Sequence, residues 1–543
     1  MKYIYSLCTL LFGVAVFLFF GLAYPHHLHY QEQFQLFLFD TAYVWDIVKL
    51  PGGVADLLGR FCTQFFLYAW VGALIIAVLL TAVQLLTLRL VSWGRFYALS
   101  FVPSFLLWLF LLDENALLGG VWAVLLTLLA SWAFDALPRS GWMRRILILV
   151  AVPVLYWVAG PVCLVFFLLQ AAGLNGKTEA PQESKVKGNA AWYGVVFVLL
   201  AVTPFLLSYC LPVATGNLWY GIHYHRYPTV FSVLLWSAAL SVFVITLIVR
   251  TLTPHPSTLV QAERKGIGSN RRGAANVHHA KHDKSQPSNL KSQTSNLLFF
   301  LLVAAIMGAF VWKNSNFKAE KVMKYDFMAR YQQWNRILET INTERPNNQI
   351  GVTVQNLALG MKGLLSKHLF DYNQNGLLGL LPDIGTDATS PLPTAEAFYQ
   401  LGMTAVAQRT VFEAQEAILD FQKSGRCYKR LAQTNLILGN YEVTRKYLTA
   451  LQKTLFYRGW ANETLPLLGD EKAIAKHPEY GRLRRMAYKD NFFFGDHVTS
   501  EMLLSLFLSN TDNHLAYEYL KAYYMLTGDR ENYSKLLLQY PER

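Results

Sequence analysis

Long apolar runs without a charged residue alternate with short polar loops through the first 312 residues of the chain. A membrane-crossing helix needs about 20 mostly apolar residues, so this pattern predicts a polytopic transmembrane helical domain. The uncharged runs are Ile4–Ala23, Phe61–Leu88, Phe96–Leu112, Ala116–Phe134, Ile146–Leu174, Ala190–Leu211, Thr229–Val249 and Leu297–Trp312. The first run is longer than a signal-peptide core and has no small-residue cleavage site after it, so we expect a retained anchor.

The pattern changes after Trp312 to shorter amphipathic segments separated by Gly, Asn and Pro, which predict a soluble helical domain over 313–543. The predicted fold class is therefore all-α. The multi-spanning membrane domain covers 1–252, and the last transmembrane helix covers 297–312. Between them, residues 253–296 are rich in Pro, Ser, Asn, Gly, Lys and His and are predicted to be a disordered basic cytoplasmic linker.

Cys427 to Leu455 resembles a tetratricopeptide repeat. Tyr428 opens a first helix, Gly439-Asn440-Tyr441 forms a turn, and a second helix follows. Similar patterns surround Gly402 and Gly528. The spacing from one repeat to the next is shorter than the motif's period of about 34 residues, so the repeats are degenerate. The alternative is a helical bundle without true repeats.

Charge follows the same division of the chain. Charged residues make up 15% of the sequence, against about 25% in ordinary soluble proteins. Residues 1–312 hold 20 Lys and Arg against 11 Asp and Glu, whereas 313–543 hold 28 against 24. The positive excess lies in loops between apolar runs and indicates orientation in a membrane. We therefore expect membrane lipids as partners and no nucleic acid.

Ile146–Leu174 contains Pro153 and Gly160-Pro161, so it is either one kinked helix or a hairpin of two short arms. The loops 139–145, 175–189 and 250–296 are rich in Lys and Arg. The positive-inside rule puts all three on the cytoplasmic side, which requires the hairpin. This gives nine crossings, a cytoplasmic N-terminus and a C-terminal domain outside. The alternative of a single helix stays open, and it would place the C-terminal domain on the cytoplasmic side.

No phosphate-binding loop, nucleophile elbow or zinc-protease motif is present. No cofactor or metal site is predicted. Histidines cluster at 26–29, 223–225 and 278–282, and we interpret the first two clusters as interfacial residues and the third as part of the linker. The apolar runs hold no ionisable Asp, Glu, Lys, Arg or His, which disfavours an ion-coupled transporter.

The loop Pro25–Arg60 is long and carries carboxylates among aromatic residues. Leu36–Phe39 and Val54–Leu58 suggest helices in the membrane interface. This architecture resembles membrane glycosyltransferases that use lipid-linked sugar donors. That alternative function implies three catalytic residues: Asp40 or Asp46 as the base and Arg60 near the phosphate, with Arg226 as a second candidate cation.

The whole chain also resembles an uncharacterised family of multi-spanning inner-membrane proteins from Bacteroidetes-type bacteria. The residues that carry the resemblance are 31–37, 51–53, 60–66, 445–448 and 455–458. The resemblance implies a bacterial inner membrane and no established activity. The expected function is an integral membrane protein whose repeats bind a protein or peptide, in envelope assembly. Whether the chain is also an enzyme stays open.

Overall fold

The computed structural model describes residues 2–90, 97–135, 141–171, 183–252, 286–385, 387–419, 422–488 and 499–541. Within these ranges the chain is helical and forms no strand, with one isolated bridge between Ala116 and His225. The predicted all-α fold class is therefore confirmed. The chain divides into two compact units: the membrane unit, Met1–Ala23, Trp45–Cys62 and Trp70–Ser315, and the helical unit, Tyr24–Val44, Thr63–Ala69 and Asn316–Arg543.

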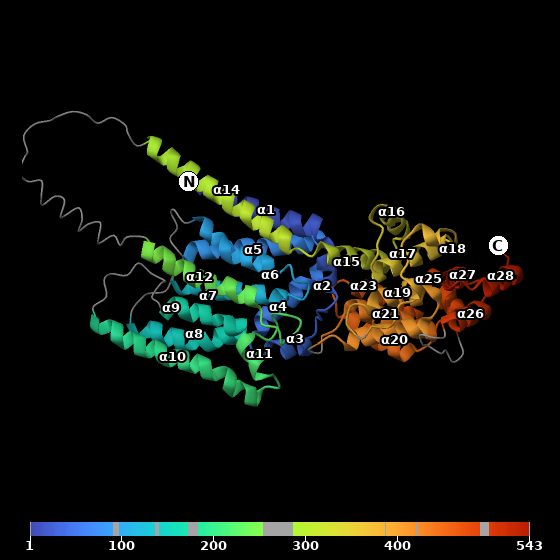
Figure 1. Ribbon diagram of the computed structural model, residues 1–543. Coiled ribbons are helices and arrows are strands. Elements are labelled where there is room, and N and C mark those ends of the chain that lie inside the picture. The colour runs from blue at the N-terminus through green and yellow to red at the C-terminus, as the bar shows by residue number, and fades with distance from the viewer. Residues whose placement is uncertain are drawn as a thin grey trace, which may run out of the picture. The chain divides into compact units, whose positions relative to one another are not determined.

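The membrane unit contains the apolar helices (Figure 1). By length and composition alone, five described stretches are suited to cross a membrane, and a sixth is if a bent pair counts as one. Residues 253–285 of the predicted linker lie outside the described residues, and α14 begins ahead of the predicted span at 297. The helices are α1 (Lys2–Leu18), η1 (Phe19–Ala23), α5 (Ala69–Leu90), η3 (Tyr97–Phe101), α6 (Val102–Phe110), α7 (Leu118–Asp135), α8 (Gly141–Ala159), η4 (Gly160–Cys163), α9 (Leu164–Ala171), α10 (Glu183–Cys210), α11 (Thr215–Tyr220), α12 (Val233–Leu252) and α14 (Gln286–Asn314).

Helices α8 and α9 form a hairpin and lie side by side (Figure 1). Residues 142–171 have the length of one span, but Arg144 near the start donates a 2.8 Å hydrogen bond to Gln170 near the end. A straight helix would hold these residues about 39 Å apart, at about 1.5 Å per residue. The chain turns at Gly160, whose φ of +73° favours glycine. The hairpin interpretation of 146–174 therefore agrees with this geometry.

The tip of this hairpin meets two loops of the membrane unit. The backbone N–H of Gly52 donates to the carbonyl of Trp157 at 2.8 Å, and the hydroxyl of Tyr224 donates to the carbonyl of Ala159 at 2.6 Å. Leu117 N–H in turn donates to the carbonyl of Tyr224 at 3.1 Å. We call the segments gathered here, 45–62, 113–117, 157–160 and 218–228, the hairpin-tip end.

Close backbone approach holds the hairpin-tip end together. A Cβ added to Gly59 would lie 2.4 Å from the backbone nitrogen of Gly119, and one added to Gly119 would lie 3.1 Å from the Cα of Asp56. Both distances are shorter than side chains tolerate, so these glycines allow α4 (Gly53–Thr63) to pack directly against the start of α7. Small residues play this part at many helix contacts in membranes.

The helical unit combines the C-terminal part of the chain with one segment of the first loop and one short segment that follows the loop. Tyr24–Val44 and Thr63–Ala69 belong to it, in addition to residues predicted as a soluble domain from the sequence. Its helices are α2 (Pro25–Glu32), η2 (Gln64–Leu67), α15 (Phe317–Arg330), α16 (Trp334–Glu344), α17 (Gln349–Met361), α18 (Leu365–His368), η5 (Leu369–Asp371), η6 (Gly376–Gly379), α19 (Pro391–Leu401), α20 (Thr404–Glu416), α21 (Gly425–Leu438), α22 (Tyr441–Gln452), α23 (Arg458–Thr464), η7 (Leu465–Leu467), α24 (Glu471–Lys476), α25 (Pro478–Met486), α26 (Thr499–Ser509), α27 (His514–Thr527) and α28 (Arg530–Gln539).

Three helix pairs of this unit share one kind of turn. Gly402, Gly439 and Gly528 each follow the last residue of a helix with φ of +90°, +82° and +72°. Only glycine adopts this left-handed conformation without strain, and it ends a helix by satisfying its last carbonyls. The turns predicted at these glycines are therefore confirmed. The assignment of the pairs to the tetratricopeptide family stays a prediction.

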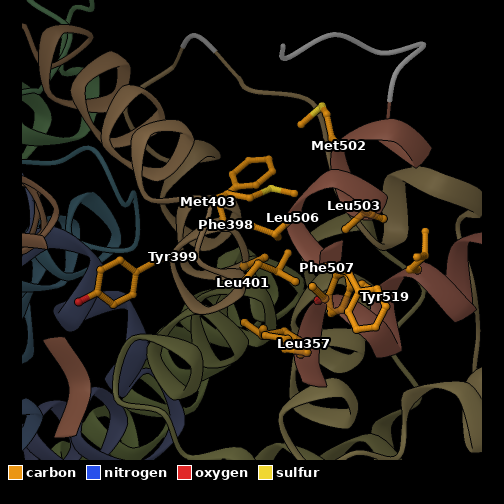
Figure 2. Close-up of a cluster of buried hydrophobic side chains, with 14 of the residues drawn as sticks. Leu357, Phe398, Tyr399, Leu401, Met403, Met502, Leu503, Leu506, Phe507 and Tyr519 are labelled. Carbon is orange, nitrogen blue, oxygen red and sulfur yellow. The ribbon is translucent and has the colours of Figure 1, made fainter. Parts of the chain in front are cut away.

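The largest core cluster of the helical unit joins helices from both ends of its C-terminal part. Figure 2 shows Leu357 of α17 and Phe398 and Leu401 of α19 close to side chains of α26 and α27. These residues are at most 2% exposed. Tyr399 points away from this group (Figure 2), because its ring lies 3.6 Å beneath the Arg430 guanidinium. The apolar side chains of this cluster include no candidate catalytic group.

Candidate functional site

The loop Pro25–Arg60 forms three short helices, α2, α3 (Thr41–Val48) and α4, joined by a segment without helix at 35–40 and by a turn at 49–52. Val54–Leu58 lies in α4, as predicted. Leu36–Phe39 was expected to be helical, but it is extended. The reason is that the backbone N–H groups of Leu36 and Phe39 donate to the carbonyls of Lys423 and Lys453 instead of to a preceding helical turn.

The three residues predicted for catalysis have three different environments. Asp40 lies in the helical unit and forms an ion pair with Lys453, whose hydrogen bond lowers the pKa of Asp40. Asp46 lies in the membrane unit, where its exposed carboxylate pairs with Lys49 at 2.6 Å. Arg60 is buried in the membrane unit. Asp40 thus belongs to a different unit from Asp46 and Arg60, and each of the two carboxylates has its own surface cation.

Arg60 forms a buried ion pair that the sequence analysis did not select. Its Nε lies 3.0 and 2.9 Å from the two carboxylate oxygens of Asp56, one helical turn earlier on α4. His223 Nε2 lies 3.7 Å from the same carboxylate, and the three side chains are 8%, 2% and 10% exposed. A carboxylate beside a histidine is suited to proton transfer, and the arginine is suited to an anion. This group is the polar centre of the hairpin-tip end.

A second carboxylate and histidine fix the loop that carries His223. His225 Nε2 lies 3.1 Å from Asp113, and the backbone N–H of Tyr227 donates to His225 Nδ1 at 3.1 Å. Both ring nitrogens of His225 therefore have hydrogen-bond partners. Burial raises the pKa of Asp113, but the hydrogen bonds from His225 and Asn115 outweigh it and lower the pKa overall. His225 is thus a positioning residue, not a base.

The helical unit holds a separate buried ionic network that begins in the first loop. Glu32 accepts a 2.7 Å hydrogen bond from the hydroxyl of Tyr457 and lies 3.4 Å from Arg330. The neighbouring Gln33 accepts a hydrogen bond of 3.1 Å from Arg426. The charges of Tyr457, Glu32, Tyr331 and Asp326 raise the pKa of Arg330 despite its burial, which alone would lower it.

The network continues along one face of α21. Arg426 binds both carboxylate oxygens of Asp326, at 2.6 and 2.9 Å, and lies 3.5 Å from Glu396. Arg430, one turn later, binds Glu396 at 2.5 Å. With Glu32 and Arg330, three carboxylates therefore meet three cations. Buried charges are tolerated when they are paired and hydrogen-bonded in this way, so these residues fix the packing of the first loop and helices α15, α19 and α21.

The extended segment Gln35–Asp40 lies across the helical unit beside this network. The backbone N–H groups of Leu36 and Phe39 donate to the carbonyls of Lys423 and Lys453, at 2.9 and 2.7 Å. Leu36 and Leu38 are 7% and 8% exposed. They share a cluster with Ala432, Leu448, Leu451, Tyr457 and Ala461. The helical unit thus holds an extended chain by main-chain hydrogen bonds, apolar pockets and charge.

Helix α2, which precedes this segment, is capped by a distant carboxylate. The two oxygens of Glu320 accept hydrogen bonds from the backbone N–H groups of His26 and His27, at 2.7 and 2.9 Å. A carboxylate at a helix N-terminus satisfies unpaired donors. Burial raises the pKa of Glu320 to about 7, although the two hydrogen bonds oppose the rise. Burial also lowers the pKa of His26 to about 4 and of His29 to about 3.

The histidine clusters singled out in the sequence do not form a described metal site. Residues 26–29 lie in the helical unit and 223–225 in the membrane unit, while 278–282 lie outside the described residues. Across the part of the chain that the structure describes, no group of three or more His, Cys, Asp or Glu side chains is arranged to hold a metal ion. We therefore assign no metal role to them.

The buried polar pairs that were not predicted fall into two kinds, those detectable from sequence spacing and those that are not. Asp56 and Arg60 stand four positions apart in a helical stretch, so their pairing was readable from the spacing. Glu32, Arg330 and Tyr457 are hundreds of positions apart, and no local pattern connects them.

The whole chain, residues 1–543, matches the family DUF6057, which is described as a family of unknown function. No curated protein matches the chain, and no solved structure does. The match agrees with the resemblance to an uncharacterised family noted in the sequence. The family description names no activity.

Proposed function

The chain belongs to the DUF6057 family of unknown function, and we propose that it is an integral membrane protein presenting the helical unit as a protein-interaction domain. The observation that carries the proposal is the extended segment Gln35–Asp40, which this unit already holds by backbone hydrogen bonds and buried leucines. The same donors, acceptors and apolar pockets are what a helical array uses to bind a peptide from a partner. Envelope assembly is the setting we propose.

The helix pairs support a repeat architecture for this domain. Helices α19 and α21 begin at Pro391 and Gly425, which are 34 positions apart (425 − 391). This equals the tetratricopeptide period of about 34 residues, whereas the aromatic residues Phe398 and Tyr428 within the same helices are 30 positions apart, so the repeats are degenerate. In such arrays each pair buries its apolar face against its neighbour, and the stack exposes long surfaces suited to peptides. We therefore propose a degenerate tetratricopeptide-like array with a protein or peptide partner.

We further propose that the helical unit faces the periplasm and that the N-terminus faces the cytoplasm, across a bacterial inner membrane. The hydroxyl of Tyr24 accepts a 3.0 Å hydrogen bond from the backbone N–H of Asn316. Tyr24 directly follows the first apolar helix, and Asn316 follows the last, α14. This contact supports a common exit face for both helices, with the N-terminus on the opposite face.

The α8–α9 hairpin supports the same orientation. Because the chain enters and leaves the hairpin at the same end, the positively charged loops predicted before and after it share one face, as the positive-inside rule requires. Nine crossings then separate the two termini. A reporter that is active only in the cytoplasm should be active when fused before Met1 and silent when fused after Arg543. Activity at both ends would contradict the orientation.

The interaction role is tested by photo-crosslinking in cells. Phe412 on α20 and Val443 on α22 are apolar side chains of the helical unit that are 49% and 39% exposed. A photoreactive residue at either position should give a discrete protein adduct that is absent without illumination. Val198, which is 58% exposed on the membrane helix α10, is the control and should give lipid adducts only. Absence of a protein adduct from both test positions would contradict the proposal.

A second candidate function is transfer of a sugar from a lipid carrier. The buried group of Asp56, Arg60 and His223 favours it, because it combines a carboxylate, a histidine and an arginine at one end of the membrane unit. Such chemistry needs a base for the acceptor hydroxyl and a cation for the phosphate leaving group. Asp40 and Asp46 stay the bases proposed from the sequence.

Substitution at the two surface carboxylates separates the candidates. Asp46→Asn alters an ion pair at the surface, and Asp40→Asn alters an ion pair but keeps the oxygen that accepts the 3.0 Å hydrogen bond from the Ala42 backbone N–H, so both variants should fold and accumulate normally. If the chain is a glycosyltransferase that uses either carboxylate, one variant should lose an envelope glycan or a lipid-linked sugar product. If both variants keep every envelope glycan while deletion of 316–543 removes the crosslinked partner, the enzyme proposal should be dropped.

A further inference from the structure

An apolar cavity of about 220 Å³ lies between α8 and α10 in the membrane unit. Both helices contribute residues spaced three, four and seven apart, which is one face of each helix. The cavity therefore follows the two helices over about 10 Å, at about 1.5 Å per residue. Its lining consists of Leu149, Val152, Pro153 and Tyr156 from α8 and Val196, Leu199, Leu200 and Thr203 from α10.

The cavity is open on one side, where Leu149 and Leu199 are 43% and 51% exposed, and its lining offers few polar partners. The polar side chains are those of Tyr156 and Thr203, and each already donates its proton to a backbone carbonyl, of Leu218 at 2.9 Å and of Leu199 at 2.7 Å. Buried water needs two to four polar partners, and apolar cavities of about 150 Å³ stay dry and take up apolar ligands.

The position of the cavity identifies an apolar occupant. Residues 142–171 and 192–210 both have the length and composition of membrane spans, and only 11% of the second stretch is buried within the protein. Helix α10 therefore exposes most of its surface to its surroundings. In a bilayer those surroundings are lipid hydrocarbon, which runs roughly parallel to spanning helices. A cavity that is elongated along the two helices therefore has the orientation of a lipid acyl chain.

We propose that this cavity binds one acyl chain of a membrane phospholipid, which fills the space between α8 and α10. The lipid packs against Leu149 and Leu199, which line the cavity and are 43% and 51% exposed in the protein alone. It supplies the apolar contacts that α10 lacks from other helices. This site does not depend on the function proposed above, since it lies in the membrane unit and concerns no partner of the helical unit.

The test uses the full chain, reconstituted in vesicles of phosphatidylethanolamine and phosphatidylglycerol that contain a phospholipid with a diazirine in the middle of one acyl chain. After illumination, peptide mapping should locate lipid adducts on the cavity-lining residues of α8 and α10. Val196→Trp places a large side chain in the cavity and should abolish those adducts. Leu200→Trp, on the same lining, is the second blocking variant.

Val195→Trp is the matched control, because Val195 is adjacent in sequence but 59% exposed and outside the cavity lining. It should leave the cavity adducts unchanged. All variants should elute as one peak of unchanged size and keep their helical circular dichroism, and a blocking variant that fails this check is replaced by the other. Cavity adducts that persist in a folded Val196→Trp or Leu200→Trp variant, or adducts confined to exposed faces in the unmodified chain, would overturn the proposal.

Discussion

The extended segment of the first loop provides a quantitative test of how the helical unit is built. Leu36 and Leu38 are 7% and 8% exposed, and truncation of a buried leucine to alanine costs about 2–5 kcal/mol. The two sites are neighbours, so their effects do not simply add, and about 4 kcal/mol is a conservative total for the double variant. That is a large part of the about 5–15 kcal/mol that stabilises a typical domain.

The remaining contacts of the segment are too weak to replace the leucines. Its two backbone hydrogen bonds, from Leu36 and Phe39 to Lys423 and Lys453, contribute about 1 kcal/mol each. The ion pair between Asp40 and Lys453 is partly exposed, so solvent screens it and it adds little. In Leu36→Ala/Leu38→Ala, the segment should therefore detach from the helical unit far more often, even if the helices themselves persist.

Hydrogen exchange measured by mass spectrometry on the full chain reports this detachment. The amides of residues 36 and 39 should be protected in the unmodified protein, and a loss of about 4 kcal/mol should speed their exchange by about 10³. Leu455→Ala is the control, because Leu455 is 43% exposed in the same unit, and it should leave both amides protected. If the double variant exchanges no faster than this control, the buried leucines do not hold the segment.

Three further predictions concern the buried charges. Arg426→Met should destabilise the helical unit by about 3–5 kcal/mol because it leaves Asp326 buried without its cation, whereas Arg409→Met, at an exposed pair, should cost less than about 1 kcal/mol in thermal unfolding. The pKa of Glu320 is raised from 4.5 to about 7 in the folded protein. Its contribution to the free energy of unfolding is therefore complete below pH 4.5 and is lost as the pH rises to 7. Glu320→Gln should remove this part of the pH dependence of stability, and an unchanged dependence of stability on pH would refute the assignment. The pKa of His29 is lowered from 6.5 to about 3. Its contribution to the free energy of unfolding is therefore complete above pH 6.5 and is lost on acidification. His29→Phe should make the helical unit more resistant to unfolding by acid when stability is measured against pH.

The features that local sequence patterns encode were predictable. Gly402, Gly439 and Gly528 end helices because glycine alone adopts the left-handed turn at low cost, so a glycine between two helical patterns is readable from the sequence. The reversal within 146–174 was readable from loop charge and from Gly160-Pro161, and the Arg144–Gln170 hydrogen bond agrees with it.

The features that depend on distant parts of the chain were not predictable. Leu36–Phe39 resembles an amphipathic helix in isolation, and only the apolar surface formed by residues 432–461 makes an extended chain more favourable. The proposed catalytic residues illustrate the same limit. Asp40 and Asp46 attract attention as loop carboxylates, but their nearby lysines occupy them. The buried partner of Arg60 is Asp56, whose four-residue spacing was readable, but the third member, His223, is distant in the sequence and was not.

The central claim is that the first part of the loop, up to Val44, belongs to the helical unit, and a disulfide between that part and the C-terminal helices tests it most directly. In a cysteine-free background, Asp40→Cys and Lys453→Cys replace two residues that form an ion pair beside a backbone hydrogen bond of 2.7 Å. A protease site inserted within 253–285 then cuts the chain between them. We predict that the cut halves stay joined on a non-reducing gel, separate after reduction, and separate without reduction when either cysteine is absent. Halves that separate under non-reducing conditions, in protein that retains its helical circular dichroism, would contradict the claim.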